Sequence, residues 1–395
     1  MKVYVPLDSA AVALGADAVA EAIVAEAARR GVTVELVRNG SRGMVWLEPL
    51  VEVVTEAGRM GVGPMTVADV PALFGGIARH PKSLGLVEDL PWMKGQTRLT
   101  FARVGVVDPL SLDDYRAHGG FAGLDRAKAM TPVEIVGEVT ESGLRGRGGA
   151  GFPTGIKWKT VSEAKADRKY IVCNADEGDS ATFADRMLME GDPFTLIEGM
   201  AIAGLACGAT KGFVYIRSEY PVAIRVMEAA VRIARDAGVL GAAFDMEIRV
   251  GAGAYVCGEE TSLLNSLEGK RGVVRAKPPL PALEGFMGKP TVVNNVISLA
   301  SVPVIMARGA AHYKDFGLGR SRGTIPLQIA GNVRFGGLYE CAFGLTLGQI
   351  VDDIAGGTAT GRPVKAVQVG GPLGAYHPRA DFDTPFGYEE FTGKD

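Results

Sequence analysis

The sequence is poor in cysteine, and its four cysteines are widely separated. Cys173, Cys207, Cys257 and Cys341 form no C-x-x-C pair. The chain therefore shows neither a zinc nor an iron–sulfur ligand spacing. Each cysteine lies in an apolar stretch, which is typical of a reduced and buried side chain. We expect these residues to pack in the core and to bind no metal.

Two other features that the sequence lacks exclude further classes of protein. No uninterrupted apolar run approaches the roughly 18–20 residues of a membrane-spanning helix, and the nearest, residues 292–307, contains Asn, Ser and Pro. The formal net charge of −3 leaves no excess of Lys and Arg for a bulk polyanion such as DNA. Met1 leads directly into a strand pattern rather than a signal peptide. We expect a cytoplasmic protein with no membrane span and no nucleic-acid partner.

Glycine is abundant, with 54 of 395 residues, about twice the usual share. A hydrophobic fraction of 47% is ample for packed cores. We divide the chain into three α/β blocks: residues 1–108, 109–323 and 324–395. The first should hold strands at residues 2–6, 32–37, 46–55 and 65–67 and a helix over 9–30. In the second, strands at 170–173, 213–216 and 244–250 alternate with helices at 193–208 and 221–238, which predicts a mostly parallel sheet with helical cover. The third should hold strands at 326–330 and 364–369 and a short helix at 346–354.

The strongest local motif is a glycine-rich loop at residues 145–155, which leaves backbone N–H groups open to a phosphate or a flat ring. Gly146-x-Gly148-x-x-Gly151 formally matches the dinucleotide fingerprint. However, a helix at 131–143 precedes the loop, and Phe152-Pro153 should interrupt any helix after it, so we reject an ordinary Rossmann turn. Arg145, Arg147 and Lys157 favour an anionic ligand, whereas a mobile glycine loop is the plain structural alternative.

Three further segments carry polar groups at predicted element ends. Asn174, Asp176, Glu177 and Asp179 follow a strand, where α/β sheets place ligand groups; a solvated acidic turn is the alternative. Residues 251–262 join a strand to a helix with Glu259 and Glu260 in its first turn, which an ordinary capped helix would also explain. Residues 275–295 run from a basic Pro-rich stretch to Asn294 and Asn295, or form a simple connector and cap. Together the four segments suggest one large nucleotide-like ligand or two stacked ones.

These segments, in this order, resemble the NADH-oxidising FMN flavoprotein of respiratory complex I. The run from Gly143 to Trp158 looks like its FMN loop, and the similarity spans roughly residues 110–378. Related modules occur in NAD-reducing hydrogenases and in NAD-dependent molybdenum formate dehydrogenases. The first block is similar to a thioredoxin-like domain without cluster cysteines, and the third resembles a ubiquitin-like SLBB domain. The implied fold class is α/β, with a central FMN- and NAD-binding domain between these two.

The resemblance implies FMN and NAD as cofactors. NAD(H) and FMN would exchange a hydride between nicotinamide C4 and flavin N5, and electrons would then pass singly to or from iron–sulfur clusters. The implied FMN site comprises Gly146, Arg147, Gly148, Gly149, Lys157, Asn174, Asp176, Glu177, Tyr255, Gly258, Glu259, Val293, Asn294 and Asn295. The implied NAD site comprises Phe152, Asp179, Glu260 and Lys277. Thr160 and Leu280 stand where respiratory relatives typically have Phe, so Phe152 would be the main aromatic platform.

The absence of cysteine from residues 1–172 makes the chain look most like the beta subunit of a formate dehydrogenase. It would then reduce NAD⁺ beside a small [2Fe–2S] thioredoxin-like subunit and a large molybdenum and iron–sulfur catalytic subunit. The family's [4Fe–4S] helical domain is expected to follow Asp395 in a longer chain. The alternatives are a diaphorase subunit of an NAD-reducing hydrogenase or of a complex I-type NADH dehydrogenase, and a flavin-free assembly scaffold.

Overall fold

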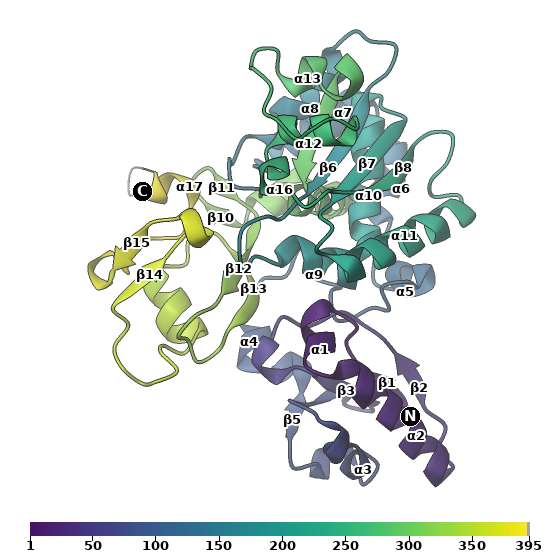
Figure 1. Ribbon diagram of the computed structural model, residues 1–395, viewed down its shortest axis with the longest axis vertical. Helices are drawn as coiled ribbons and strands as arrows, with labels where there is room; N and C mark the ends of the chain where they lie inside the picture. The colour runs from purple at the N-terminus through teal and green to yellow at the C-terminus, as the bar shows by residue number, and fades with distance from the viewer. Residues whose placement is uncertain (393–395) are drawn as a thin grey trace.

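The computed structural model describes residues 1–392, and Figure 1 shows three parts. The N-terminal part holds a five-stranded sheet of order β2-β1-β3-β4-β5. Its strands are β1 (Lys2–Tyr4), β2 (Glu35–Val37), β3 (Val51–Thr55), β4 (Gly58–Val62) and β5 (Ser83–Leu86). Only the β1–β2 pair is parallel.

Two predictions for this part are wrong. The helix expected over residues 9–30 is broken into α1 (Ser9–Ala13) and α2 (Ala16–Arg30). The break lies at Gly15, whose φ of 98° is incompatible with a right-handed helix. The strand expected at 65–67 is absent, since β4 ends at Val62 and residues 67–69 form a 3₁₀ turn.

The central part is built on four parallel strands in the order β8-β7-β6-β9, which confirms the predicted parallel sheet. The strands are β6 (Tyr170–Ala175), β7 (Lys211–Ile216), β8 (Asp245–Val250) and β9 (Thr291–Asn295). The sequence analysis missed β9. The covering helices include α6 (Ala122–Lys128), α7 (Pro132–Glu141), α8 (Thr154–Glu163), α10 (Pro193–Cys207), α11 (Pro221–Asp236), α12 (Glu260–Leu267), α14 (Val296–Ala300) and α15 (Val302–Arg308).

Alternate residues of this sheet enter two different cores. Ile171 and Cys173 of β6 belong to the large core that includes α10, whereas Tyr170 and Val172 join the smaller core that includes Leu263 of α12. A strand exposes successive side chains to opposite faces, so helices must cover both. All four cysteines are buried, as predicted.

The C-terminal part contains two antiparallel strand pairs, β12 (Thr324–Ile329) with β13 (Gly337–Ala342) and β14 (Ala366–Gln368) with β15 (Tyr376–Pro378). A single helical stretch, Gln349–Ile354, lies between them. Trp92, from the N-terminal part, enters a core with Leu327 and Tyr339 and donates from Nε1 to the carbonyl of Leu338 at 3.2 Å. The first and third parts therefore share a core. The domain boundaries 1–108, 109–323 and 324–395 stay predictions, and residues 393–395 lie outside the described chain.

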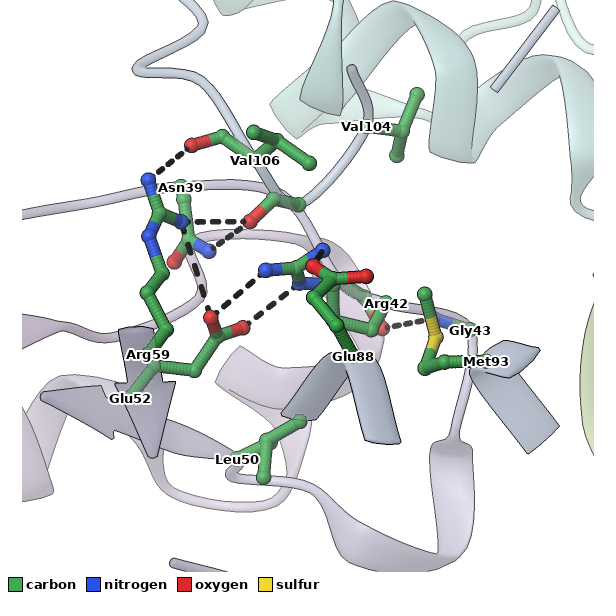
Figure 2. Close-up of polar contacts among 12 residues, drawn as sticks. Asn39, Arg42, Gly43, Leu50, Glu52, Arg59, Glu88, Met93, Val104 and Val106 are labelled. Atoms are coloured by element: carbon green, nitrogen blue, oxygen red, sulfur yellow. Dashed lines mark hydrogen bonds and ion pairs between the residues drawn. The ribbon is translucent and has the colours of Figure 1, made fainter. Parts of the chain in front are cut away.

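Buried charges fix the N-terminal sheet to the segment that leads into the central part (Figure 2). Arg42 makes two hydrogen bonds of 2.8 Å to the two carboxylate oxygens of Glu52, and both side chains are almost fully buried. Its third nitrogen reaches Glu88 at 2.8 Å. Arg59 and Asn39 donate to the carbonyl of Gly105 at 3.3 and 2.7 Å. A bidentate pair of this kind holds its partners in one orientation.

Within residues 1–392, we find no helix that combines the length and the apolar character needed to cross a bilayer.

Replacing Glu52 with Gln should destabilise the fold, because Arg42 would lose its buried, bidentate carboxylate and keep only the pair with Glu88, whose side chain is largely exposed. Breaking one partner of a buried ion pair costs about 3–5 kcal/mol. We expect the urea midpoint to fall clearly. The control is Glu35→Gln in the same sheet, which breaks the exposed pair with Lys2 and should change the midpoint little. Equal effects of the two substitutions would contradict a special role for the buried pair.

Candidate functional site

The carboxyl ends of the four parallel strands meet at one edge of the central sheet. Asn174 of β6 lies opposite Asn295 of β9 and Tyr215 of β7, and Ile216 of β7 lies opposite Val250 of β8. The segments that follow these strands therefore start side by side. Asn174 donates from Nδ2 to the carbonyl of Gly258 at 2.8 Å, which joins the β6 and β8 segments directly.

The glycine-rich loop connects α7 to α8 and reaches the same edge. A bridge between Arg145 and Pro153, with the Gly146 N–H donating to the Phe152 carbonyl at 2.8 Å, folds the loop back on itself. Gly148 packs against Asn295 so closely that a Cβ would lie 3.0 Å from the Asn295 Cβ. The helix preceding the loop agrees with our rejection of a Rossmann turn. The expectation that Phe152-Pro153 would interrupt the next helix was wrong, because Pro153 serves as the N-cap and α8 begins at Thr154.

Several donors at this edge have no protein partner. Within residues 1–392, the backbone N–H groups of Gly148, Gly149 and Ala150 donate to no protein acceptor. The hydroxyls of Thr154 and Ser262, in the first turns of α8 and α12, are buried and also unpartnered. The three loop N–H groups belong to exposed residues and are open to a ligand, whereas the two buried hydroxyls lack the partner that buried polar groups normally have. Amide and hydroxyl donors fit the phosphate, ribityl and carbonyl groups of FMN.

The side chain of Arg147 does not belong to this set of open donors. Its guanidinium donates to the carbonyls of Thr324, Arg322 and Arg145 at 3.1, 2.6 and 2.8 Å. It therefore ties the loop to the C-terminal part, and only its backbone N–H, bonded to Ser298 Oγ at 2.8 Å, lies toward the strand edge. Arg145 is also engaged, because its guanidinium donates to the Gly151 carbonyl and pairs with Glu389. Of the three predicted cations, Lys157 is therefore the one nearest the ends of the strands. Its ammonium group donates to the Val293 carbonyl at 2.8 Å and lies 3.4 Å from Glu260.

The acidic side chains in the segment after β6 differ in the hydrogen bonds that they accept. Glu177 caps α9 (Ala184–Gly191) by accepting from the N–H groups of Asp185 and Arg186, both at 3.2 Å, and burial raises the pKa of Glu177. Asp176 is half-buried, and its carboxylate accepts no hydrogen bond within residues 1–392. Burial raises the pKa of Asp176 to about 6, against the opposing charge of Arg217. Asp176 is therefore the open carboxylate of this segment.

The two asparagines of β9 also differ. Asn294 is buried and accepts from the indole N–H of Trp158 at 2.9 Å, so its side chain has a packing role. Asn295 caps α14 through Oδ1 and donates from Nδ2 to Asp185 at 2.7 Å. Burial raises the pKa of Asp185 well above its usual range.

Two of the residues predicted to bind NAD, Glu260 and Lys277, form an ion pair at this edge. Lys277 pairs with both Glu259 and Glu260, at 3.0 and 2.9 Å. Glu259 also caps α12. Burial alone would raise the pKa of Glu259, but hydrogen bonds from Thr261 and Ser262, together with Lys277, lower it to about 2.

Two aromatic rings at the same edge are largely exposed. Tyr255 donates to Asp179 at 2.6 Å and covers Gly178. The ring of Phe152 is 51% exposed and makes no aromatic contact within residues 1–392. A flat, exposed ring in the glycine-rich loop is a suitable surface for a nucleotide base.

Sequence reasoning missed three residues of this site. Arg217 donates to the carbonyl of Glu177, and Tyr220 donates to the Glu177 carboxylate at 3.1 Å. Both follow β7, so the rule that placed ligand groups after the other parallel strands could have found them. Asp185 gave no comparable signal, because its partner Asn295 is distant in sequence.

Comparisons with known proteins agree with this geometry. The family model described as the Nuo51 FMN-binding domain matches residues 139–304, which include the glycine loop and all four strands. The NADP-reducing hydrogenase subunit HndC of Solidesulfovibrio fructosivorans is 49% identical over 75% of this chain and 62% of its own length. An NADH-quinone oxidoreductase subunit of Rhizobium meliloti is 47% identical over 73% of this chain and 70% of its own length.

A solved structure extends the likeness to the N-terminal part. The crystal structure of an air-oxidised NAD⁺-reducing [NiFe]-hydrogenase superposes with a TM-score of 0.65 at 30% identity, over 98% of this chain and 66% of that one. The fold and the strand-edge site define an α/β flavoprotein. The chain belongs to the family of the 51 kDa FMN-binding subunit of complex I, whose cofactors are FMN and NAD. It spans between 62% and 70% of the length of the two relatives named above.

Removing the ionisable group of Asp176 should change how stability depends on pH. The usual pKa is near 3.8 and the folded value is about 6. The contribution of Asp176 to stability is therefore fully present below about pH 4 and is lost as the pH rises through 6. In flavin-free protein, the Tm of Asp176→Asn should exceed that of the wild type by a few degrees at pH 8, and the difference should vanish near pH 4. Asp125→Asn, at an exposed position of α6, is the control. A Tm difference that does not change with pH would contradict the raised pKa.

Proposed function

We propose that this chain is a diaphorase subunit that transfers a hydride between NAD(H) and FMN and exchanges single electrons with iron–sulfur clusters elsewhere. The observation that carries the proposal is the gathering of unpaired backbone donors and one open carboxylate at the edge where four parallel strands end. When bound, FMN would supply the conversion between two-electron and one-electron transfer. The protein's part is to bind and orient the two nucleotides.

Each group has a proposed task that follows from its contacts. The N–H groups of Gly148 and Gly149 would donate to FMN, and Asn174 and Asn295 would fix the strand ends beside it. Asp176, with a pKa of about 6, is mostly ionised at pH 7 and would accept hydrogen bonds from ribityl hydroxyls or a ring N–H. Arg147 would hold the glycine loop in place through the C-terminal part.

The NAD(H) site is proposed on the outer side of the flavin. Phe152 would provide an exposed face for stacking, and Asp179, Glu260 and Lys277 would provide polar contacts. Lys277, held between two carboxylates, would position Glu259 and Glu260. Holding the two rings together makes the hydride step effectively unimolecular.

A methyl group at Gly148 should weaken flavin binding. The added Cβ would lie 3.0 Å from the Asn295 Cβ, so the loop or Asn295 must shift. For Gly148→Ala we expect about tenfold weaker binding of FMN, which corresponds to about 1.4 kcal/mol. Bound FMN is measured by its visible absorbance and by fluorescence titration.

Gly137→Ala is the matched control, because a Cβ at Gly137 in α7 meets no atom within 4 Å. It should bind FMN as the wild type does. A wild-type chain that takes up no added FMN would contradict the proposed function and favour the flavin-free scaffold. Wild-type affinity in Gly148→Ala would remove the glycine loop from the site.

The proposal extends to the molecule that donates the electrons for NAD⁺ reduction. The likeness to an NAD⁺-reducing hydrogenase covers 98% of this chain, including the N-terminal part, and supports H₂ as the electron source. Formate stays the second candidate, because no cysteine precedes Cys173 and the beta subunits of formate dehydrogenases share this feature. Purification of the complex with its native partners, followed by assays of NAD⁺ and NADP⁺ reduction with H₂ and with formate, separates the two. Activity with neither donor would favour a complex I-type NADH dehydrogenase.

We also propose that the chain works in a cytoplasmic complex of several subunits. The partners would be a small [2Fe–2S] subunit and a large catalytic subunit, and a [4Fe–4S] cluster would be bound outside residues 1–395. The relatives are named as subunits of hydrogenases and quinone oxidoreductases, which supports such an assembly.

A further inference from the structure

Helix α9 lies between the strand-edge site and the N-terminal part of the chain (Figure 1). Seven of its eight residues are buried, all except Arg186. At 1.5 Å per residue the helix is about 12 Å long. It is therefore a short, enclosed element with one end at the proposed flavin site.

The first turn of α9 is part of that site. Its N–H groups at Asp185 and Arg186 bond to Glu177, and the Asp185 carboxylate accepts from Asn295 at 2.7 Å. Asn295 in turn lies against Gly148 of the glycine loop. A shift of this turn would therefore move the groups proposed to hold FMN.

The last turn of α9 is held by the N-terminal part. Glu190 is 3% exposed, and its two carboxylate oxygens accept from the N–H and the hydroxyl of Ser9, at 2.8 and 2.6 Å. Next to it, a Cβ on Gly40 would lie 2.7 Å from the Cα of Gly191, so the two backbones are in direct contact. The N-terminal part thus contacts the end of α9 both by hydrogen bonds and by close packing.

Acidic side chains are crowded at this contact. The buried carboxyl of Asp8, from the N-terminal part, lies near Glu190, and burial together with Asp8 raises the pKa of Glu190 to about 7. Arg186 of α9 lies 3.9 Å from Glu190, and its Nε is buried without a hydrogen-bond partner. Arg186 is therefore the cation of α9 that faces this acidic group, and a change in how the N-terminal part sits would alter its surroundings.

We propose that the N-terminal part positions α9 through Ser9 and Glu190, and thereby sets the affinity and the reduction potential of the flavin bound at the other end. The proposal rests on the proposed function. Ser9 and Glu190 are positioning residues, because they act through the helix and Asp185 rather than by touching the cofactor. A close-packed interior transmits such a displacement because it has little free volume to absorb it.

The test compares variants of the full chain. Ser9→Ala removes one of the two donors to Glu190, and Glu190→Gln replaces the carboxyl group, whose pKa burial raises to about 7, with an amide of nearly the same volume. Both should weaken FMN binding, by about threefold to tenfold for the loss of one ordinary hydrogen bond, and should shift the flavin midpoint potential. Ser9→Thr keeps the hydroxyl and should restore wild-type values. FMN affinity is measured by fluorescence titration and the potential by spectroelectrochemistry.

Ser111→Ala is the matched control. Ser111 caps α5 (Leu112–Ala117) by accepting from the Asp114 N–H at 3.1 Å and has no bond to α9, so it should lower the Tm without changing the flavin. Wild-type affinity and potential in both Ser9→Ala and Glu190→Gln would overturn the proposal, as would changes that follow the loss of Tm equally in all three variants. A wild type that binds no FMN would instead overturn the proposed function, and this inference with it.

Discussion

The parallel pairing of β6 with β7 and β9 is the constraint on which the rest of the structure depends. Parallel strands share a direction, so their carboxyl ends must lie along one edge and their connections must cross over as helices. In this chain the pairing sets Asn174 opposite Asn295 and brings the segments after β6, β7, β8 and β9 into contact. Side chains and amides that are more than 100 residues apart in sequence thereby form one polar surface.

The site concentrates acids where burial disfavours their charge. Glu177 and Asp185 are tolerated because backbone, tyrosine and asparagine donors surround them, whereas Asp176 has no such support. Buried carboxylates and unpaired donors reduce stability unless a ligand completes them, and they are typical of sites that bind ligands. The cost is offset elsewhere in the fold. The hydrogen bonds from Arg59 and Asn39 to the Gly105 carbonyl and the shared core around Trp92 hold the N-terminal part against the rest of the chain.

The interpretation from sequence was most accurate where a residue acts through its own neighbours in the chain. The glycine loop, strands β6, β7 and β8 of the central sheet and the cap formed by Asn295 all follow local rules. The errors arose where a single position decided the outcome: Gly15 divides a helix that the alanine-rich pattern made continuous, and Pro153 starts α8 where we expected an interruption. Arg147 looked like an anion ligand, but its partners Arg322 and Thr324 lie in segments that only the fold brings near.

Composition and local motifs by themselves predicted an α/β protein and suggested a nucleotide-like ligand for its middle third, because glycine loops and polar side chains at strand ends present donors and acceptors at one edge of a parallel sheet. Tertiary structure alone decided which of these groups remain open to a ligand. Each polar side chain can make only a few hydrogen bonds. Whether Arg147, Asn294 and Asp176 make theirs to the protein or leave them for a ligand depends on residues far away in the chain. It also decided that α9 links the N-terminal part to the strand edge, since Ser9 and Glu190 meet only when the separate sheets have packed together.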